Sequence, residues 1–157
     1  MTETYVTFQR ARHDDMVSHY LGVPELLAGL AGADIPMAVV TSKRREMALR
    51  TLDRCGIREY FQHVVSADDV ERGKPDPEPV YLAMARLGIP AGPDVLFVGD
   101  SVFDIRAGRA AGVSTGAALW GPIEREVLAV ENPDHWLGGP LDLLDLVGCS
   151  GAGPSGP

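Results

Sequence analysis

The stretch Val95-Leu-Phe-Val-Gly-Asp-Ser-Val-Phe-Asp-Ile-Arg-Ala-Gly108 decides the fold class. Its apolar first half ends at Gly99-Asp100, a second carboxylate follows at Asp104, and a helix-like segment begins at once. A short apolar run of this kind predicts a buried parallel strand that leads directly into a helix. Open α/β sheets place their active sites at the carboxyl ends of such strands, so both acids are candidate site residues.

Two carboxylates at the end of one strand repel each other unless a cation or a proton lies between them. Oxygen ligands suit Mg²⁺, which usually takes one or two protein carboxylates and completes its shell with water and phosphate oxygens. The alternative is structural: Asp100 caps the next helix and Asp104 is an exposed acid of its first turn. This stretch alone leaves both interpretations open.

Most of the remaining chain alternates between strand and helix patterns. We expect an α/β fold of the Rossmann-like, doubly wound type, with a parallel sheet covered by helices on both faces. Strands are predicted at 37–40, 63–67, 95–99 and 113–120, and helices at 24–30, 43–54, 80–87, 122–130 and 141–147.

The two ends of the chain differ from this pattern. Residues 4–21 carry apolar side chains at a spacing of three to four, which predicts a helix and nothing strand-like. Residues 148–157 are mostly Gly, Ser and Pro, which predicts a disordered tail.

Composition excludes several classes of function. The formal net charge of −8 and the pI near 4.9 argue against a nucleic-acid partner. No apolar run approaches the ~18 residues of a membrane span, and the N-terminus lacks a signal-peptide pattern. We therefore expect a cytoplasmic protein without membrane contact, with reduced cysteines and Cys55 in the core.

Polar groups follow three of the expected strands: Thr41-Ser42, Lys74, and Asp100 with Asp104. The ends of parallel strands meet at one sheet edge, so these groups can surround a single anion. A hydroxyl and an ammonium would bind phosphoryl oxygens while carboxylates hold a metal, a division of labour that fits phosphoryl transfer. Taken singly, Thr41 is more simply a helix cap and Lys74 a solvated loop charge.

The series Val39-Val-Thr-Ser-Lys43, Gly73-Lys-Pro-Asp-Pro77 and Val98-Gly-Asp-Ser-Val-Phe-Asp104 resembles motifs two, three and four of the haloacid dehalogenase-like (HAD) phosphohydrolases. The likeness runs from about Tyr5 to Leu146 and is strongest to the branch of phosphoglycolate phosphatases and a pyrophosphatase with a helical cap.

This resemblance implies Mg²⁺-dependent hydrolysis of a small phosphate ester or pyrophosphate through an aspartyl-phosphate. It implies that Thr41, with Ser42, binds phosphate, that Lys74 steadies the nucleophile and the phosphate, and that Asp100 binds Mg²⁺. Asp104 would support the metal directly or through water.

One motif of the family is absent from the sequence. The nucleophile belongs to an Asp-x-Asp at the end of the central strand, between the strands that end at Thr41 and Asp100, and no Asp-x-Asp occurs in these 157 residues. We therefore expect residues 1–22 to be the remnant of a helical cap, residues 23–147 a core lacking its first strand, and residues 148–157 the tail. An unfilled strand position would leave unpaired backbone groups.

Three functional hypotheses follow. The chain is a phosphohydrolase with impaired turnover; or it is a non-catalytic domain that binds phosphate and Mg²⁺, or forms a homo-oligomer in which a partner supplies the missing strand; or the natural chain begins earlier. A response-regulator receiver domain ranks lower, because its acidic pair comes early in the chain.

A few other polar or aromatic side chains are less informative. Arg44 and Arg45 can meet a second phosphate or a carboxylate, although exposed helix charges are the simpler interpretation. His13 is expected at the surface, and Trp120 and Trp136 in the core.

Overall fold

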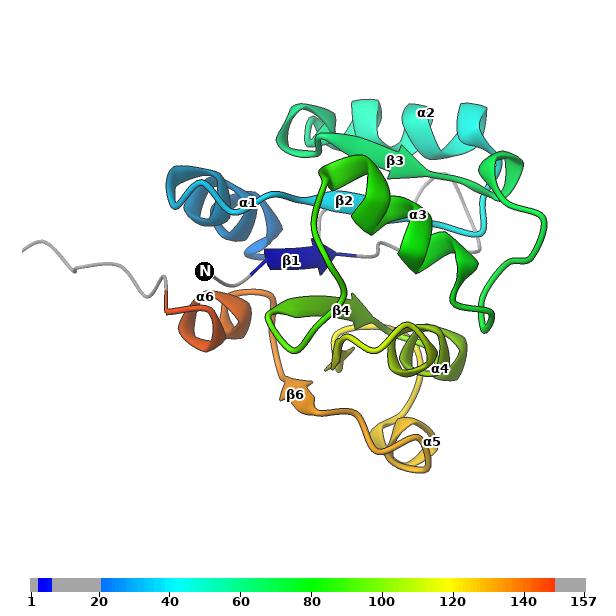
Figure 1. Cartoon of the computed structure of the whole chain (residues 1–157). Helices are drawn as coiled ribbons and strands as arrows, with labels where there is room; N and C mark the ends of the chain where they lie inside the picture. Colours follow the sequence, from blue (N-terminus) through cyan, green and yellow to red (C-terminus); the bar gives the residue numbers. More distant parts are fainter. Residues whose placement is uncertain (1–2, 7–20, 149–157) are drawn as a thin grey trace, which may run out of the picture.

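The computed structural model describes residues 3–6 and 21–148 (Figure 1). Parallel strands form the middle of this fold. One sheet has the order β1-β4-β5-β6, and β2 pairs separately with β3. The strands are β1 (Glu3–Val6), β2 (Ala38–Val40), β3 (His63–Val65), β4 (Val95–Gly99), β5 (Ser114–Ala118) and β6 (His135–Leu137).

Strand β1 corrects two expectations drawn from the sequence. Residues 4–6 belong to a strand and not to a helix, and Glu3–Val6 pairs in parallel with Val95–Val98 of β4. β1 is also in contact with β2, and it lies between β2 and β4 in Figure 1. The place expected to be empty is therefore filled by the chain's own first strand; the rest of the predicted helix, residues 7–20, lies outside the described residues.

Helices cover both faces of the strands. They are α1 (Val23–Gly32), α2 (Arg45–Cys55), α3 (Glu78–Leu87), α4 (Val102–Ala110), α5 (Arg125–Ala129) and α6 (Asp142–Leu146), with 3₁₀ turns η2 (Arg58–Tyr60) and η3 (Ala67–Asp69). The doubly wound α/β fold predicted from the sequence is confirmed. The helices predicted between residues 24 and 147 are all present, with ends that differ by a few residues.

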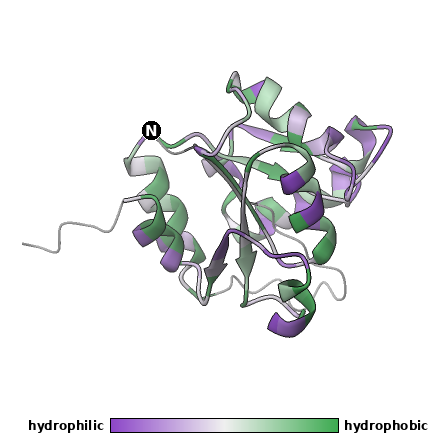
Figure 2. Ribbon diagram, turned by 60° about the horizontal axis from the view of Figure 1, so that its bottom comes forward, coloured by the Kyte–Doolittle hydropathy of each residue, from purple (hydrophilic) through white to green (hydrophobic). Residues whose placement is uncertain are grey.

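The core is divided between the two faces of the sheet by strand alternation. Val39, Leu96 and Val98 pack with α1, α2 and α6, whereas Val40 and Phe97 pack with α3 and α4. Figure 2 shows the helices carrying hydrophilic and hydrophobic residues together, as expected for helices that each cover one face. Both faces of β2 and β4 are therefore buried, which explains their unbroken apolar sequences.

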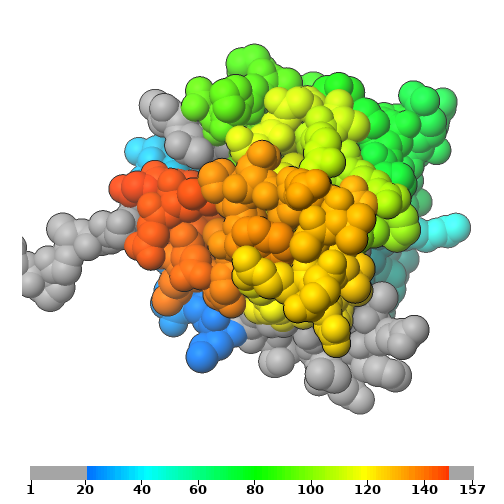
Figure 3. All heavy atoms as spheres, turned by 90° about the horizontal axis from the view of Figure 1, so that it is seen from below, coloured from blue at the N-terminus to red at the C-terminus, as the bar shows by residue number. Residues whose placement is uncertain are grey.

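The C-terminal part completes one side of the molecule. β5, α5 and β6 lie together on the face shown in Figure 3, and α6 continues from them toward α1. The structure adds β6, which the sequence analysis did not predict. Residues 149–157 of the expected tail lie outside the described residues, and within residues 3–6 and 21–148 no helix has the length and apolar character needed to cross a bilayer.

Candidate functional site

The carboxyl end of β4 is built around Asp104. Its carboxylate accepts hydrogen bonds from the Ser101 amide (3.1 Å) and hydroxyl (2.9 Å), while the Ser101 Oγ accepts from the Asp104 amide (3.3 Å). This reciprocal capping box starts α4. Ser101, and not Asp100, is thus the helix cap, so the structural alternative for Asp100 is wrong.

Lys74 reaches Asp104 from the loop that follows β3. Its Nζ lies 2.5 Å from Asp104 Oδ1, and the two side chains are 2% and 0% exposed. A buried charge is stable only when it is paired and hydrogen-bonded. Neither residue is therefore a solvated surface charge: Lys74 is fixed by Asp104, and both Asp104 oxygens already accept hydrogen bonds.

A cavity of about 280 Å³ lies beside this ion pair and is lined by Thr41, Ser42, Ala67, Val70, Glu71, Gly73, Lys74 and Pro79. Thr41 is buried, its amide donates to the Val65 carbonyl (2.9 Å), and its Oγ1 accepts from the Lys43 amide (3.2 Å). The structure thus brings Thr41, Ser42 and Lys74 to one cavity, as the sequence predicts. Asp104 adjoins it through Lys74.

Asp100 follows β4 directly and is 9% exposed. The backbone of Gly121 lies against it so closely that a Cβ at that position would come within 2.7 Å of Asp100 Oδ2. Asp100 follows β4 and Thr41 follows β2, so both lie at the carboxyl ends of parallel strands.

Magnesium can be judged against these donors. Within the part of the chain that the structure describes, no three His, Cys, Asp or Glu side chains are grouped to hold a metal ion. Carboxylate oxygens suit Mg²⁺ together with water and phosphate oxygens. Asp100 and Asp104 are the residues that would hold the ion, with Asp104 also accepting hydrogen bonds from Lys74 and Ser101.

Glu78, which the sequence pattern does not single out, shapes the loop that carries Lys74. Its Oε1 accepts from the Glu71 amide (2.9 Å) and its Oε2 from the Arg72 amide (3.0 Å). One carboxylate therefore ties the beginning of the loop to the first turn of α3, on either side of Lys74. The Lys-Pro-Asp-Pro-Glu sequence contained the residue, but only the folded loop shows its role.

Arg45 is not a simple exposed charge, since it forms an ion pair with Asp69 at 2.8 Å, and Arg44 is exposed. Cys55, Trp120 and Trp136 are half-buried against the core. His13 lies outside the described residues.

The sequence matches the family model for haloacid dehalogenase-like hydrolases over residues 1–118. It is 37% identical over 148 residues to pyrophosphatase PpaX of Bacillus velezensis, covering 94% of this chain and 68% of that protein. It is 40% identical over 131 residues to the phosphoglycolate phosphatase of Pectobacterium atrosepticum, covering 83% and 56%.

Solved structures of the same family resemble this fold. A HAD-superfamily hydrolase of subfamily IA from Geobacter sulfurreducens PCA superposes with a TM-score of 0.69 and 28% identity over 82% of this chain and 55% of that one. A phosphoglycolate phosphatase predicted in Haemophilus somnus 129PT gives a TM-score of 0.75 and 29% identity, covering 81% and 56%. The chain thus spans little more than half of these two structures. By sequence and by fold, the chain belongs to the haloacid dehalogenase-like hydrolase family.

Proposed function

We propose that this chain is a HAD phosphohydrolase core that binds a small phosphate ester or pyrophosphate in the Thr41–Lys74 cavity, and that its turnover is severely impaired. The observation that supports binding is the convergence of Thr41, Ser42 and Lys74 on one cavity, with Lys74 held by a buried carboxylate. The relatives named above act on pyrophosphate or phosphoglycolate, which are small phosphorylated compounds.

Each side chain has a distinct part in this proposal. The Thr41 and Ser42 hydroxyls donate to phosphoryl oxygens, and the Lys74 ammonium offsets their negative charge. Asp104 positions the ammonium and keeps it from turning away. Mg²⁺, held by Asp100, would neutralise further charge on the phosphoryl group when bound.

Impaired turnover follows from the sequence of the strand in the central position. β1 ends at Val6, and neither the segment that follows it nor any other part of the 157 residues contains an Asp-x-Asp. An aspartyl-phosphate requires an aspartate nucleophile in line with the phosphorus atom. We therefore expect this chain to bind phosphate compounds without hydrolysing them. We further propose that it acts in the cytoplasm, without a nucleic-acid or membrane partner.

The test combines binding with turnover. We expect inorganic phosphate to bind, detected by NMR titration, and to bind at least tenfold more weakly to Thr41→Val. Thr51→Val is the matched control, because Thr51 lies on α2 and its hydroxyl donates to the Met47 carbonyl, outside the cavity. Equal phosphate binding by wild type and Thr41→Val would contradict the assigned site.

Turnover is measured as phosphate release from an aryl phosphate with and without Mg²⁺. The expected result is no release above background from a folded chain. Metal-dependent release that Asp100→Asn abolishes would contradict the proposed impairment and require a nucleophile elsewhere in the chain.

A further inference from the structure

Strand β3 lies at the outer edge of the strand array, next to β2 alone among the described strands (Figure 1). The Val65 carbonyl accepts from the Thr41 amide, so it faces β2. Backbone polar groups alternate in direction along a strand, so Val64 directs its carbonyl away from β2, toward the open edge. Exposed edges of this kind are templates on which another chain can add a strand.

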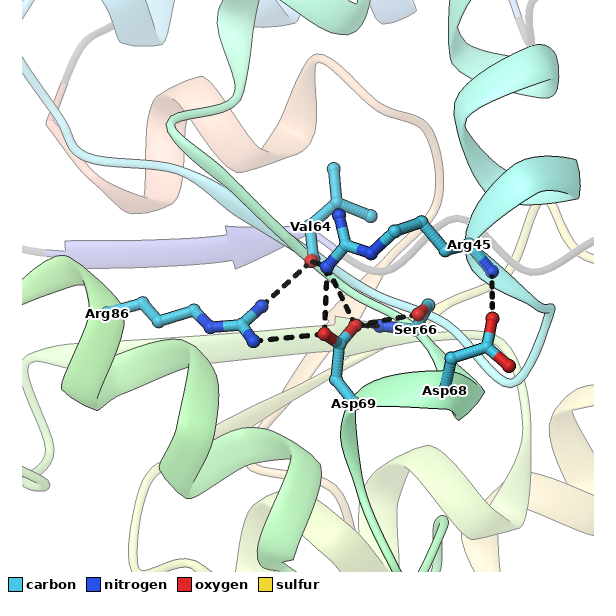
Figure 4. Close-up of polar contacts among 6 residues, drawn as sticks. All are labelled: Arg45, Val64, Ser66, Asp68, Asp69 and Arg86. Carbon is cyan, nitrogen blue, oxygen red and sulfur yellow. Dashed lines mark hydrogen bonds and ion pairs between the residues drawn. The ribbon is translucent and has the colours of Figure 1, made fainter.

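Two arginines occupy this open edge. The Arg45 Nη2 and the Arg86 Nη1 each donate to the Val64 carbonyl at 3.1 Å. Arg45 comes from α2 and Arg86 from α3, which pack on opposite faces of the strands. The two guanidinium groups therefore reach the same carbonyl oxygen from both faces of the sheet, as Figure 4 shows.

Asp69 completes the arrangement. Its carboxylate accepts from Arg45 (2.8 Å) and Arg86 (3.0 Å), and also from the Ser66 amide (2.7 Å). Ser66 is two residues beyond Val64, so its amide faces the same open edge. A carboxylate and two guanidinium groups thus bind the acceptor and the donor that a further strand would use.

The charge state of Asp69 suits this role. Burial by itself raises the pKa of its carboxyl, but hydrogen bonds from Ser66, Arg45 and Arg86 outweigh burial and hold the pKa well below the usual range. The side chain is 13% exposed, compared with 43% for Arg45 and 30% for Arg86. The carboxylate is the inner member of the cluster, and the guanidinium groups cover it.

A groove of about 880 Å³ lies beside this cluster, and the residues that line it include Phe61, Val64, Arg45, Arg58 and Arg86. Arg58 pairs with Asp53 at 3.0 Å and is about half exposed. It lines the groove together with Arg45 and Arg86, and its ion-pair partner Asp53 lies on α2.

We propose that Arg45, Asp69 and Arg86 form a side-chain edge cap that prevents a second copy of this chain from pairing its own β3 with the β3 edge. A second copy is the natural occupant because two identical edges related by a two-fold axis are self-complementary. The cap fills the hydrogen-bonding positions of the absent strand with side chains that cannot propagate a sheet.

The test removes the two donors and keeps Asp69. In Arg45→Met/Arg86→Met we expect the molar mass from light scattering to double relative to wild type as concentration rises from micromolar to hundreds of micromolar. Arg58→Met is the matched control, with one charge removed from the same groove and the wild-type mass expected. A folded double variant that keeps the wild-type mass at every concentration would overturn the proposal.

Amide hydrogen exchange provides a measurement that does not need the double variant to fold. In the wild type, the Ser66 amide should exchange at least tenfold more slowly than an open loop amide, because Asp69 accepts from it; exchange at the open rate would overturn the proposal. In the dimeric variant, the Val64 amide should become at least tenfold slower than in wild type. Doubled mass without this slowing would indicate association elsewhere, which also contradicts the edge cap.

Discussion

Lys74 and Asp104 form a buried ion pair, 2.5 Å between Nζ and Oδ1, that joins the loop after β3 to the helix after β4. These segments belong to the two separately hydrogen-bonded groups of strands. The pair therefore fixes the position of Lys74 relative to the carboxyl end of β4, and it connects the two halves of the candidate site.

Removal of the Lys74 ammonium should strongly destabilise the fold. Lys74→Met leaves Asp104 charged and buried without its cation, so we expect the free energy of unfolding to fall by about 3–5 kcal/mol. Urea denaturation followed by circular dichroism measures the loss. Lys74→Met/Asp104→Asn should recover part of it, because the second change removes the uncompensated charge. A double variant no more stable than Lys74→Met would show that charge burial is not the cause.

Gly99 is required by the close approach of Asp104. A Cβ at residue 99 would overlap the Asp104 side chain and lie 2.5 Å from its Oδ2. Gly99→Ala should therefore destabilise the fold by about 1–3 kcal/mol, the usual cost of overpacking. Gly92→Ala is the control, since nothing lies within 4 Å of a Cβ there, and its effect should stay within about 0.5 kcal/mol. Similar thermal stabilities for the two variants would contradict the close contact between residue 99 and the Asp104 side chain.

Asp69 should make stability depend on acid pH. Its folded-state pKa is lowered, so its contribution is complete above the unfolded-state pKa of about 4 and is lost as pH falls toward the folded-state value. Asp69→Asn should lose about 2 kcal/mol at pH 7, and the difference from wild type should shrink below about pH 4. Urea titrations at several pH values measure this difference.

The control for Asp69 is a surface ion pair of ordinary strength. Asp53→Asn breaks the exposed pair with Arg58 and should cost less than about 1 kcal/mol. If the difference in the free energy of unfolding between wild type and Asp69→Asn were to increase as pH falls, the direction assigned to the pKa of Asp69 would be wrong.

Glu78 should act as a positioning residue for the Lys74 loop. Glu78→Ala removes the acceptor for two backbone amides, so we expect a loss of about 1–3 kcal/mol, faster amide exchange at Glu71 and Arg72, and severalfold weaker phosphate binding. Glu78→Gln keeps an amide oxygen and should restore part of the binding. Glu46→Ala, which changes an exposed acid on α2, is the control. Phosphate binding unaffected by Glu78→Ala would limit Glu78 to a structural role.

The sequence predicts most of this fold because its strands and helices carry clear local patterns. β1 escapes prediction because only four residues, Glu3–Val6, adopt the strand, and pairing with β4 outweighs the helical spacing around them. β6 escapes because three residues, His135–Leu137, are too few to show a period.

The candidate site was likewise predictable from the sequence only in part. Thr41, Ser42 and Lys74 are predicted to meet because parallel strands end at one edge, and the cavity confirms that they do. The sequence does not predict that Asp104 binds Lys74, since the choice between a metal and an ammonium depends on side-chain packing across long sequence distances. Arg45 is misjudged for the same reason: its partner Asp69 follows a different strand.

The position of β1 also has a consequence for how the chain folds. Glu3 pairs with Val95, so the first strand of the chain finds its hydrogen-bonding neighbour only after β2, β3 and their helices have been passed. Contacts so distant in sequence close large loops and slow folding. We expect β2 and β3 to pair early in folding. Pairing of β1 with β4, which completes the middle of the strand array, should follow late.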